Sequence, residues 1–104
     1  MKIKTFAVAA ATLAFAISGT VQAGGAELFQ SKTCWSCHGK DAKSPVLPIY
    51  PKLAGQNEQY LLNQMKDIKS GARNNGQTAA MKGVMGMVNE QEMAEIAKWL
   101  ATLN

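Results

Sequence analysis

The stretch Cys34-Trp35-Ser36-Cys37-His38 contains both cysteines and the only histidine of the 104-residue chain. Two thiols separated by two residues and followed at once by an imidazole form the C-x-x-C-H pattern of covalent haem attachment. The two sulfurs, one short turn apart, can add to the two vinyl groups of one porphyrin edge, and the histidine can then bind the iron. We therefore expect Cys34 and Cys37 to hold one haem and His38 to ligate its iron.

Other uses of these three side chains each lack something in the sequence. A structural zinc site needs four nitrogen or sulfur ligands, whereas the chain has only two cysteines and one histidine. A redox-active dithiol is expected beside a strand–helix–strand pattern, and no strand pattern is found here. A plain disulfide would leave His38 without a role. Haem attachment is the interpretation that uses all three residues.

The N-terminal segment has the pattern of an export signal. Two lysines precede an apolar, alanine-rich run at 6–17, and the segment closes on Val21-Gln22-Ala23, which ends in a small residue. The apolar run is shorter than the roughly 20 residues that a membrane-spanning helix needs. We therefore expect a signal peptide at 1–23, cleaved after Ala23, and a single domain at 24–104 that has no membrane span and resides in the periplasm.

The net charge of +4 overstates the basic character of this domain. Two of the eleven basic residues belong to the predicted signal peptide, whereas all seven acidic residues lie in 24–104, so this part carries +2. Two haem propionates would offset most of that charge, and a nucleic-acid partner is not indicated. A side-chain core in so small a domain contributes only about 3–5 kcal/mol, so a buried macrocycle would also help to stabilise the fold.

Hydrophobic periodicity predicts three helices and no strand. The first spans 26–32. The second spans 58–70, with Asn57 as its N-cap and Gly71 as its C-terminal stop. The third begins at Asn89, which forms a capping-box pattern with a glutamate three residues later. In the last two helices, apolar residues recur with the spacing of one helical face, so we expect an all-α domain.

A loop that contains three prolines follows the C-x-x-C-H motif, at 39–56. Prolines prevent a regular helix or a central strand there. A histidine that binds a metal usually donates its second N–H to a carbonyl or carboxylate, which fixes the ring. The carbonyl of Pro48 is our candidate for bracing His38 in this way, although a proline that only stiffens the loop fits the residues equally well.

Residues 72–87 show no sustained hydrophobic period and are expected to form a second loop. Long loops in small domains tend to have a function. A thioether is a soft ligand that suits haem iron opposite an imidazole. The residues alone leave three candidates for the sixth iron ligand, which are Met81, Met85 and Met87.

The order of these elements resembles class I cytochrome c over the whole of 24–104. The stretch Pro51-Lys52-Leu53-Ala54-Gly55-Gln56 is most similar to small periplasmic cytochromes c-553 and to the halves of related di-haem carriers, and Tyr60-Leu61 and 68–73 support this. The resemblance implies an all-α fold around one covalently attached haem c. It also implies that the first and last helices cross, which suits Gly25.

The resemblance also implies roles for individual residues. In these relatives the ligand methionine lies seven residues before the hydrophobic residue that precedes the last helix's N-cap. That residue is Val88 here, so Met81 is implied as the sixth iron ligand, and the other two loop methionines would line the pocket. The family pattern includes a proline whose carbonyl braces the histidine, and Pro48 fits it best.

A haem iron with two filled axial sites implies an electron carrier that cycles between ferrous and ferric iron, and not an enzyme. Its partners would be redox proteins. Basic residues expected around the haem edge would suit partners with acidic docking faces: Lys40, Lys43, Lys52, Arg73 and Lys82. Two alternatives stay open, a haem-carrying electron-transfer subunit of a periplasmic oxidoreductase complex, and a haem catalyst or gas sensor with a labile sixth ligand.

Overall fold

The computed structural model describes residues 24–104, so the predicted signal peptide lies outside the described residues. This part of the chain contains no strand, which confirms the all-α prediction. None of its helices is long and apolar enough to cross a bilayer. The helices, in chain order, are α2 (Gly25–Ser31), α3 (Trp35–His38), α4 (Glu58–Ser70), α5 (Thr78–Met85) and α6 (Glu90–Ala101).

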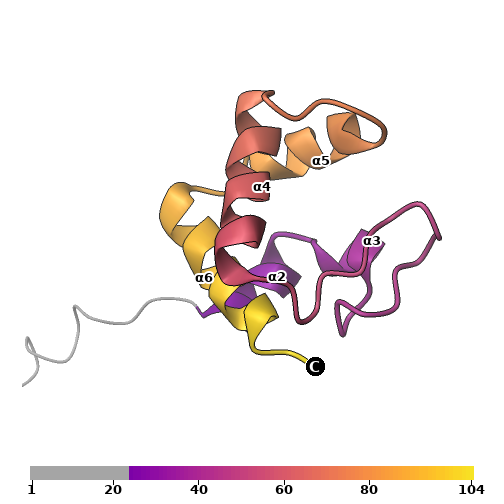
Figure 1. Cartoon of the computed structure of the whole chain (residues 1–104), viewed down its shortest axis with the longest axis vertical. Coiled ribbons are helices and arrows are strands. Elements are labelled where there is room, and N and C mark those ends of the chain that lie inside the picture. The colour runs from indigo at the N-terminus through magenta and orange to yellow at the C-terminus, as the bar shows by residue number, and fades with distance from the viewer. Residues whose placement is uncertain (1–23) are drawn as a thin grey trace, which may run out of the picture.

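Helix α6 packs against both α2 and α4, and α5 packs against α4 (Figure 1). The short helix α3 and the loop that follows it lie on the same side of α4 as α5. The packed body therefore places the C-x-x-C-H helix and the methionine-bearing helix on one side of the molecule.

The ends of α4 and α6 are fixed by the predicted caps. The side-chain oxygen of Asn57 accepts the backbone N–H of Tyr60, and α4 stops at Gly71, whose φ of 90° is left-handed. Asn89 and Glu92 form both hydrogen bonds of a capping box at the start of α6. Because each cap satisfies backbone groups that the helix leaves unpaired, α4 begins and ends, and α6 begins, close to where the sequence predicts.

The structure corrects the prediction for 72–87, where a loop was expected. Its second half is helix α5, two turns long. The N-cap residue Gln77 makes no side-chain cap hydrogen bond, so the sequence contains no start signal, and eight residues are too few for a sustained period. The first helix is also corrected, because α2 begins at Gly25 and not at Ala26.

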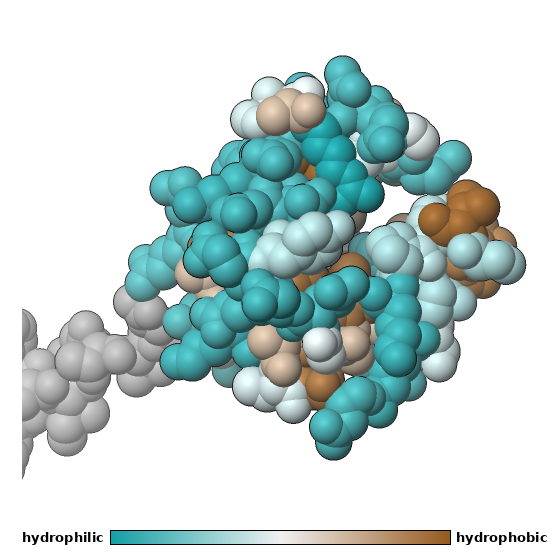
Figure 2. Space-filling model, viewed as in Figure 1, coloured by the Kyte–Doolittle hydropathy of each residue, from teal (hydrophilic) through white to brown (hydrophobic). Residues whose placement is uncertain are grey.

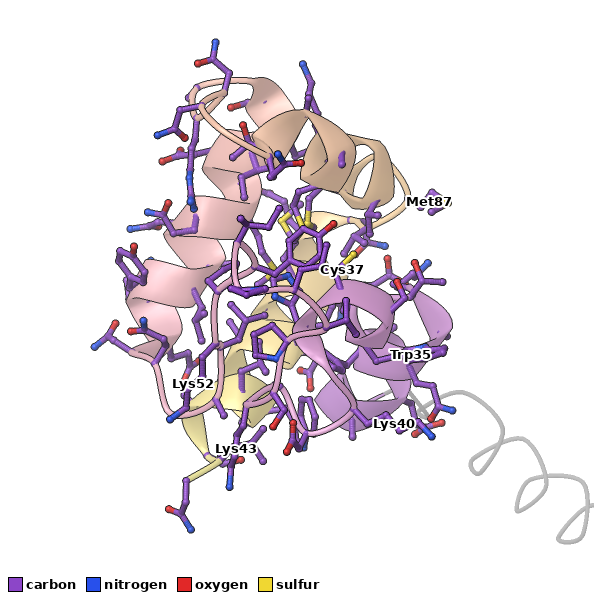
Figure 3. The ribbon with its side chains drawn as sticks, turned by 90° about the vertical axis from the view of Figure 1, so that its right-hand side faces the viewer. Trp35, Cys37, Lys40, Lys43, Lys52 and Met87 are labelled. Carbon is purple, nitrogen blue, oxygen red and sulfur yellow. The ribbon has the colours of Figure 1, made fainter. Side chains whose placement is uncertain are left out.

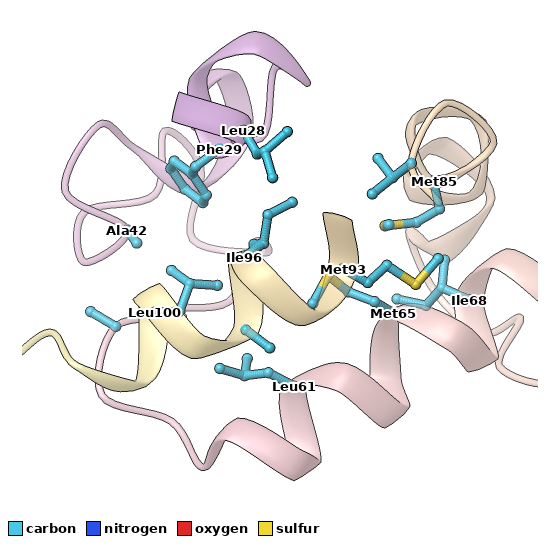
Figure 4. Packing of buried hydrophobic residues seen from close by; sticks show 13 residues of the cluster. Leu28, Phe29, Ala42, Leu61, Met65, Ile68, Met85, Met93, Ile96 and Leu100 are labelled. Atoms are coloured by element: carbon cyan, nitrogen blue, oxygen red, sulfur yellow. The ribbon is translucent and has the colours of Figure 1, made fainter. Parts of the chain in front are cut away.

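The hydrophobic core lies between α2, α4 and α6 (Figure 4). Side chains of α2 meet those of α6, and α4 closes the core from the opposite side, while Met85 extends it to α5. The buried hydrophobic residues are Leu28, Phe29, Ala42, Ala54, Leu61, Met65, Ile68, Met85, Val88, Met93, Ile96, Ala97 and Leu100.

The expected crossing of the first and last helices is confirmed. At Gly25 a Cβ atom would overlap the carbonyl oxygen of Glu95 and the side chain of Trp99. The rings of Phe29 and Trp99 lie beside this crossing with their centroids 5.2 Å apart. Only glycine allows the two backbones to approach this closely.

Candidate haem site

The C-x-x-C-H stretch folds as one helical turn. Cys34 is the N-cap of α3, and the backbone N–H of His38 donates to its carbonyl at 3.1 Å. Both cysteines carry free, partly exposed thiols. Residues three apart lie on the same side of a helix, so the backbone presents the two sulfurs in the arrangement that attachment to one porphyrin edge requires.

The two cysteines differ in their surroundings. Cys34 packs against the hydrophobic core, and burial raises the pKa of its thiol from 9.0 to about 11. The thiolate is the reactive form of cysteine. In the chain without haem, burial therefore disfavours the thiolate of Cys34.

The imidazole of His38 is buried and oriented by a backbone carbonyl. Its Nδ1 lies 3.0 Å from the carbonyl oxygen of Pro51. Because a carbonyl can only accept a hydrogen bond, Nδ1 carries the proton and donates it, which leaves the Nε2 lone pair for a metal. Burial lowers the pKa of His38, and the hydrogen bond to Pro51 opposes this only in part. The ring is therefore held neutral, as an iron ligand must be.

The prediction that the carbonyl of Pro48 braces His38 was wrong, because the carbonyl of Pro51 takes this role. Pro48 is exposed, and it lies in a turn closed by the N–H of Tyr50 donating to the carbonyl of Leu47. The loop returns beside α3 only after this turn, so the carbonyl of Pro51 reaches His38. The signal available in the sequence was that Pro51 opens the Pro-Lys-Leu-Ala-Gly-Gln stretch.

The three candidate methionines have different environments. Met85 is 1% exposed and is part of the core, whereas Met87 is 59% exposed and projects away from the α5 end (Figure 3). Met81 lies one turn before Met85 on α5, is partly buried, and packs on the edge of the core. Of the three sulfurs, only that of Met81 is neither committed to the core nor directed into solvent, so its environment suits a ligand.

Hydrophobic side chains left uncovered by the core gather at the outer part of the loop after α3, coloured brown in Figure 2. Val46, Leu47 and Ile49 are each about half exposed or more, and Trp35 on α3 is also exposed. An apolar rim beside free thiols and a neutral imidazole fits a largely apolar macrocycle, so the residues present fit haem. Within 24–104, no three His, Cys, Asp or Glu side chains are grouped to hold a metal ion by themselves.

Comparison with known proteins identifies chains that are similar to this one. A family model described as "Cytochrome c" matches residues 22–104. Cytochrome c4 of Pseudomonas aeruginosa is 45% identical over 82 residues, which are 77% of this chain and 39% of that protein. Cytochrome c-553 of Nitratidesulfovibrio vulgaris is 28% identical over 93 residues, which are 89% of each chain.

A solved structure, that of Acidithiobacillus ferrooxidans cytochrome c4, superposes on this one with a TM-score of 0.66 at 27% identity. The superposition covers 83% of this chain and 53% of the other. The chain thus spans about half the length of the cytochrome c4 proteins that it matches. In three of them the matched region is 39% to 47% of the relative's own length.

Proposed function

Because this chain belongs to the cytochrome c family, we propose that it is a periplasmic electron-transfer protein that carries one haem. Membership of the family implies that haem c is bound covalently. The all-helical structure and its likeness to cytochrome c4 confirm the predicted class I cytochrome c fold. The observation that carries the proposal is the C-x-x-C-H turn, whose histidine is held neutral by burial and oriented by the carbonyl of Pro51.

In this proposal the chain holds the haem through four side chains. Cys34 and Cys37 would form the two thioether bonds, and Nε2 of His38 and the sulfur of Met81 would bind the iron. When bound, haem supplies a one-electron couple between ferric and ferrous iron. The Pro51 carbonyl fixes the ring plane of His38 and increases its donor strength, and a methionine sulfur raises the reduction potential relative to a second imidazole.

The protein would transfer electrons without transforming a substrate. If His38 and Met81 both bind the iron, residues of the chain would exclude an oxygen-containing substrate or a gas from it. Core side chains on three helices and the covalent thioether bonds would restrict movement of the ligands, which keeps the structural change between oxidation states small. These features support a carrier and not an enzyme.

Positive charge around the site supports partners with acidic docking faces. Lys40, Lys43 and Lys52 project from the loop after α3 in the view of Figure 3, which also labels Cys37. The neighbouring acidic group, Asp41, accepts the backbone N–H groups of Lys43 and Ser44. These hydrogen bonds lower the pKa of Asp41, and its single charge leaves the loop net positive.

We also propose export, with 1–23 as a signal peptide cleaved after Ala23 and 24–104 as the haem domain. The charged start and short apolar run support this division, as does the family match, which begins at residue 22. Export would bring the chain to the compartment where redox partners and haem-attachment machinery for such proteins are found.

The test is an optical spectrum of the ferric holoprotein, recorded for the wild type, Met81→Ala and Met87→Ala. A weak sulfur-to-iron charge-transfer band reports methionine ligation. We expect the band in the wild type and in Met87→Ala, because Met87 is exposed, and its loss in Met81→Ala. A band that survives in Met81→Ala would assign the ligand to another methionine.

Absence of the band from the wild type would overturn the carrier proposal. The sixth position would then be open or held by another group. Binding of carbon monoxide by the reduced wild type at neutral pH would identify the alternative, a haem catalyst or gas sensor. Purification in fixed stoichiometry with a catalytic protein would favour the subunit of an oxidoreductase complex.

A further inference from the structure

Two lysines from different helices donate to neighbouring carbonyls in the short segment that joins α5 to α6. Lys32, the C-cap residue of α2, donates through Nζ to the carbonyl oxygen of Met87 at 3.0 Å. Lys69, in the last turn of α4, donates through Nζ to the carbonyl oxygen of Val88. The ends of two helices are thus tied to consecutive residues of one connection.

Holding these side chains in place costs conformational entropy, because lysine has many rotamers in water. Hydrogen bonds from a charged donor are stronger than those between neutral groups, which offsets this cost. Lys32 is oriented further by Glu92, whose Oε2 lies 3.4 Å from its Nζ. The other oxygen of Glu92 accepts the N–H of Asn89 in the capping box. Glu92 therefore connects the first turn of α6 to the lysine that holds the carbonyl of Met87.

The connection held in this way begins where α5 ends. The main packing of α5 is against α4, and after its C-cap residue Gly86 the chain continues into Met87 and Val88. Met81 lies on this helix, one turn before its last residue, Met85. A movement of the connection would therefore carry α5, and the sulfur of Met81, with it.

We propose that Lys32 and Lys69 are positioning residues that hold α5 and thereby set how firmly the sulfur of Met81 binds the haem iron. The inference rests on the proposed function, because it takes Met81 as the sixth ligand. Neither lysine touches the iron or the haem in this role. Each acts through the backbone of the connection that follows α5.

The chain offers a matched control on the same helix. Lys66 lies one turn before Lys69 on α4, and its Nζ is 3.5 Å from Oε1 of Glu90 on α6. This pair is more exposed than that of Lys32 and Glu92. Lys66 thus has the same charge and lies on the same helix as Lys69, but it pairs with a side chain of α6 and not with a carbonyl of the connection.

The experiment uses the exported full-length holoprotein and the variants Lys32→Met, Lys69→Met and Lys66→Met. Methionine keeps most of the apolar stem of lysine and removes only the charged donor. Ferric protein is titrated with imidazole at neutral pH, and loss of the sulfur-to-iron charge-transfer band is followed. Imidazole can bind the iron only when the sulfur of Met81 has dissociated from it. The apparent affinity for imidazole therefore measures how often this sulfur dissociates.

We expect the apparent dissociation constant for imidazole to fall about tenfold in Lys69→Met and several-fold in Lys32→Met, because each variant loses a charge-assisted hydrogen bond. It should stay within about twofold of the wild type in Lys66→Met, since exposed ion pairs contribute little. The core formed by α2, α4 and α6 does not depend on these lysine Nζ contacts, and the side chains of Met85 and Val88 are each 1% exposed, so we expect the variants to fold. If Lys69→Met does not accumulate as folded protein, Lys32→Met tests the inference alone, because its contact is more exposed.

The thermal unfolding midpoint of each variant is measured in parallel. It distinguishes lysines that only stabilise the fold from lysines that position Met81. A lower midpoint in Lys69→Met or Lys32→Met with wild-type affinity for imidazole would overturn the inference, and so would equal changes of affinity in all three variants. Absence of the charge-transfer band from the wild type would overturn the proposed function, and the inference with it. A band that is present with unchanged imidazole affinity would overturn the inference alone.

Discussion

At Gly25 the crossing of α2 and α6 leaves no room for one additional carbon atom, because a Cβ would overlap the Glu95 carbonyl and the Trp99 side chain. We expect Gly25→Ala to lower the free energy of unfolding of the holoprotein by about 1–3 kcal/mol, the usual cost of overpacking. Gly24→Ala is the control, since a Cβ at Gly24 meets no atom within 4 Å. Guanidinium denaturation measures the free energy of unfolding of the two variants. Equal midpoints for the two variants would show that the helices can move apart at little cost.

Met85 and Met87 are two residues apart and are expected to respond very differently to truncation. Met85 is 1% exposed, so Met85→Ala should leave a cavity and lower the free energy of unfolding by about 2–5 kcal/mol. Met87 is exposed, so Met87→Ala should change it by less than about 0.5 kcal/mol. Urea denaturation of the two holoproteins measures this. A small effect in Met85→Ala together with loss of its charge-transfer band would reverse the roles of Met81 and Met85.

At the residue scale, the candidate-site residues that adjoin one another in sequence were the easiest to group. Cys34, Cys37 and His38 are recognised within five residues of sequence, and the structure places all three in one helical turn. The partner of His38 was predicted wrongly, because it depends on where an irregular loop returns to α3. Periodicity and capping patterns do not distinguish the carbonyl of Pro51 from that of Pro48, and only the position of Pro51 at the start of the Pro-Lys-Leu-Ala-Gly-Gln stretch marks it.

At the scale of elements, the helices with strong terminal signals were the ones predicted well. Helix α4 has an asparagine N-cap and a left-handed glycine after its end, and α6 has a capping box. Helix α5 has no side-chain cap, and its two turns are held by packing on α4 and by its connection to α6. Tertiary contacts outweigh local preference there, so the sequence pattern indicated a loop.

The capping box gives α6 a dependence on pH that Glu92→Gln should remove. The hydrogen bond from Asn89 lowers the pKa of Glu92 below its usual 4.5, with a smaller contribution from the charge of Lys32. Because the folded state holds the proton less tightly than the unfolded state, this stabilisation is complete above pH 4.5 and is lost as pH falls through the folded pKa. The difference in unfolding free energy between wild type and Glu92→Gln should therefore shrink below pH 4.5. Urea denaturation at several pH values tests this, and a constant difference would contradict it.

At the scale of the whole molecule, the packed body of α2, α4 and α6 keeps the functional residues on one side. Helices α3 and α5 lie on the same side of α4, although they are separated by about half of the domain in sequence. The family resemblance predicted a fold around one haem with crossing first and last helices, whereas composition and periodicity alone predicted only that the fold is helical. The lysines of the loop after α3 are therefore expected to surround the haem site and to influence how redox partners approach it.

This distribution of charge should make electron transfer depend on salt. We expect the rate of reduction of the ferric holoprotein by anionic hexacyanoferrate(II) to fall as ionic strength rises, because salt screens the attraction to Lys40, Lys43 and Lys52. The rate with cationic hexaammineruthenium(II) should rise under the same conditions. Lys43→Glu should slow the reaction with the anion several-fold, whereas Lys66→Glu on α4, away from that loop in sequence, should slow it less. Stopped-flow kinetics measures these rates. Rates that stay flat with ionic strength for both reagents would show that the lysines do not direct the approach of charged partners.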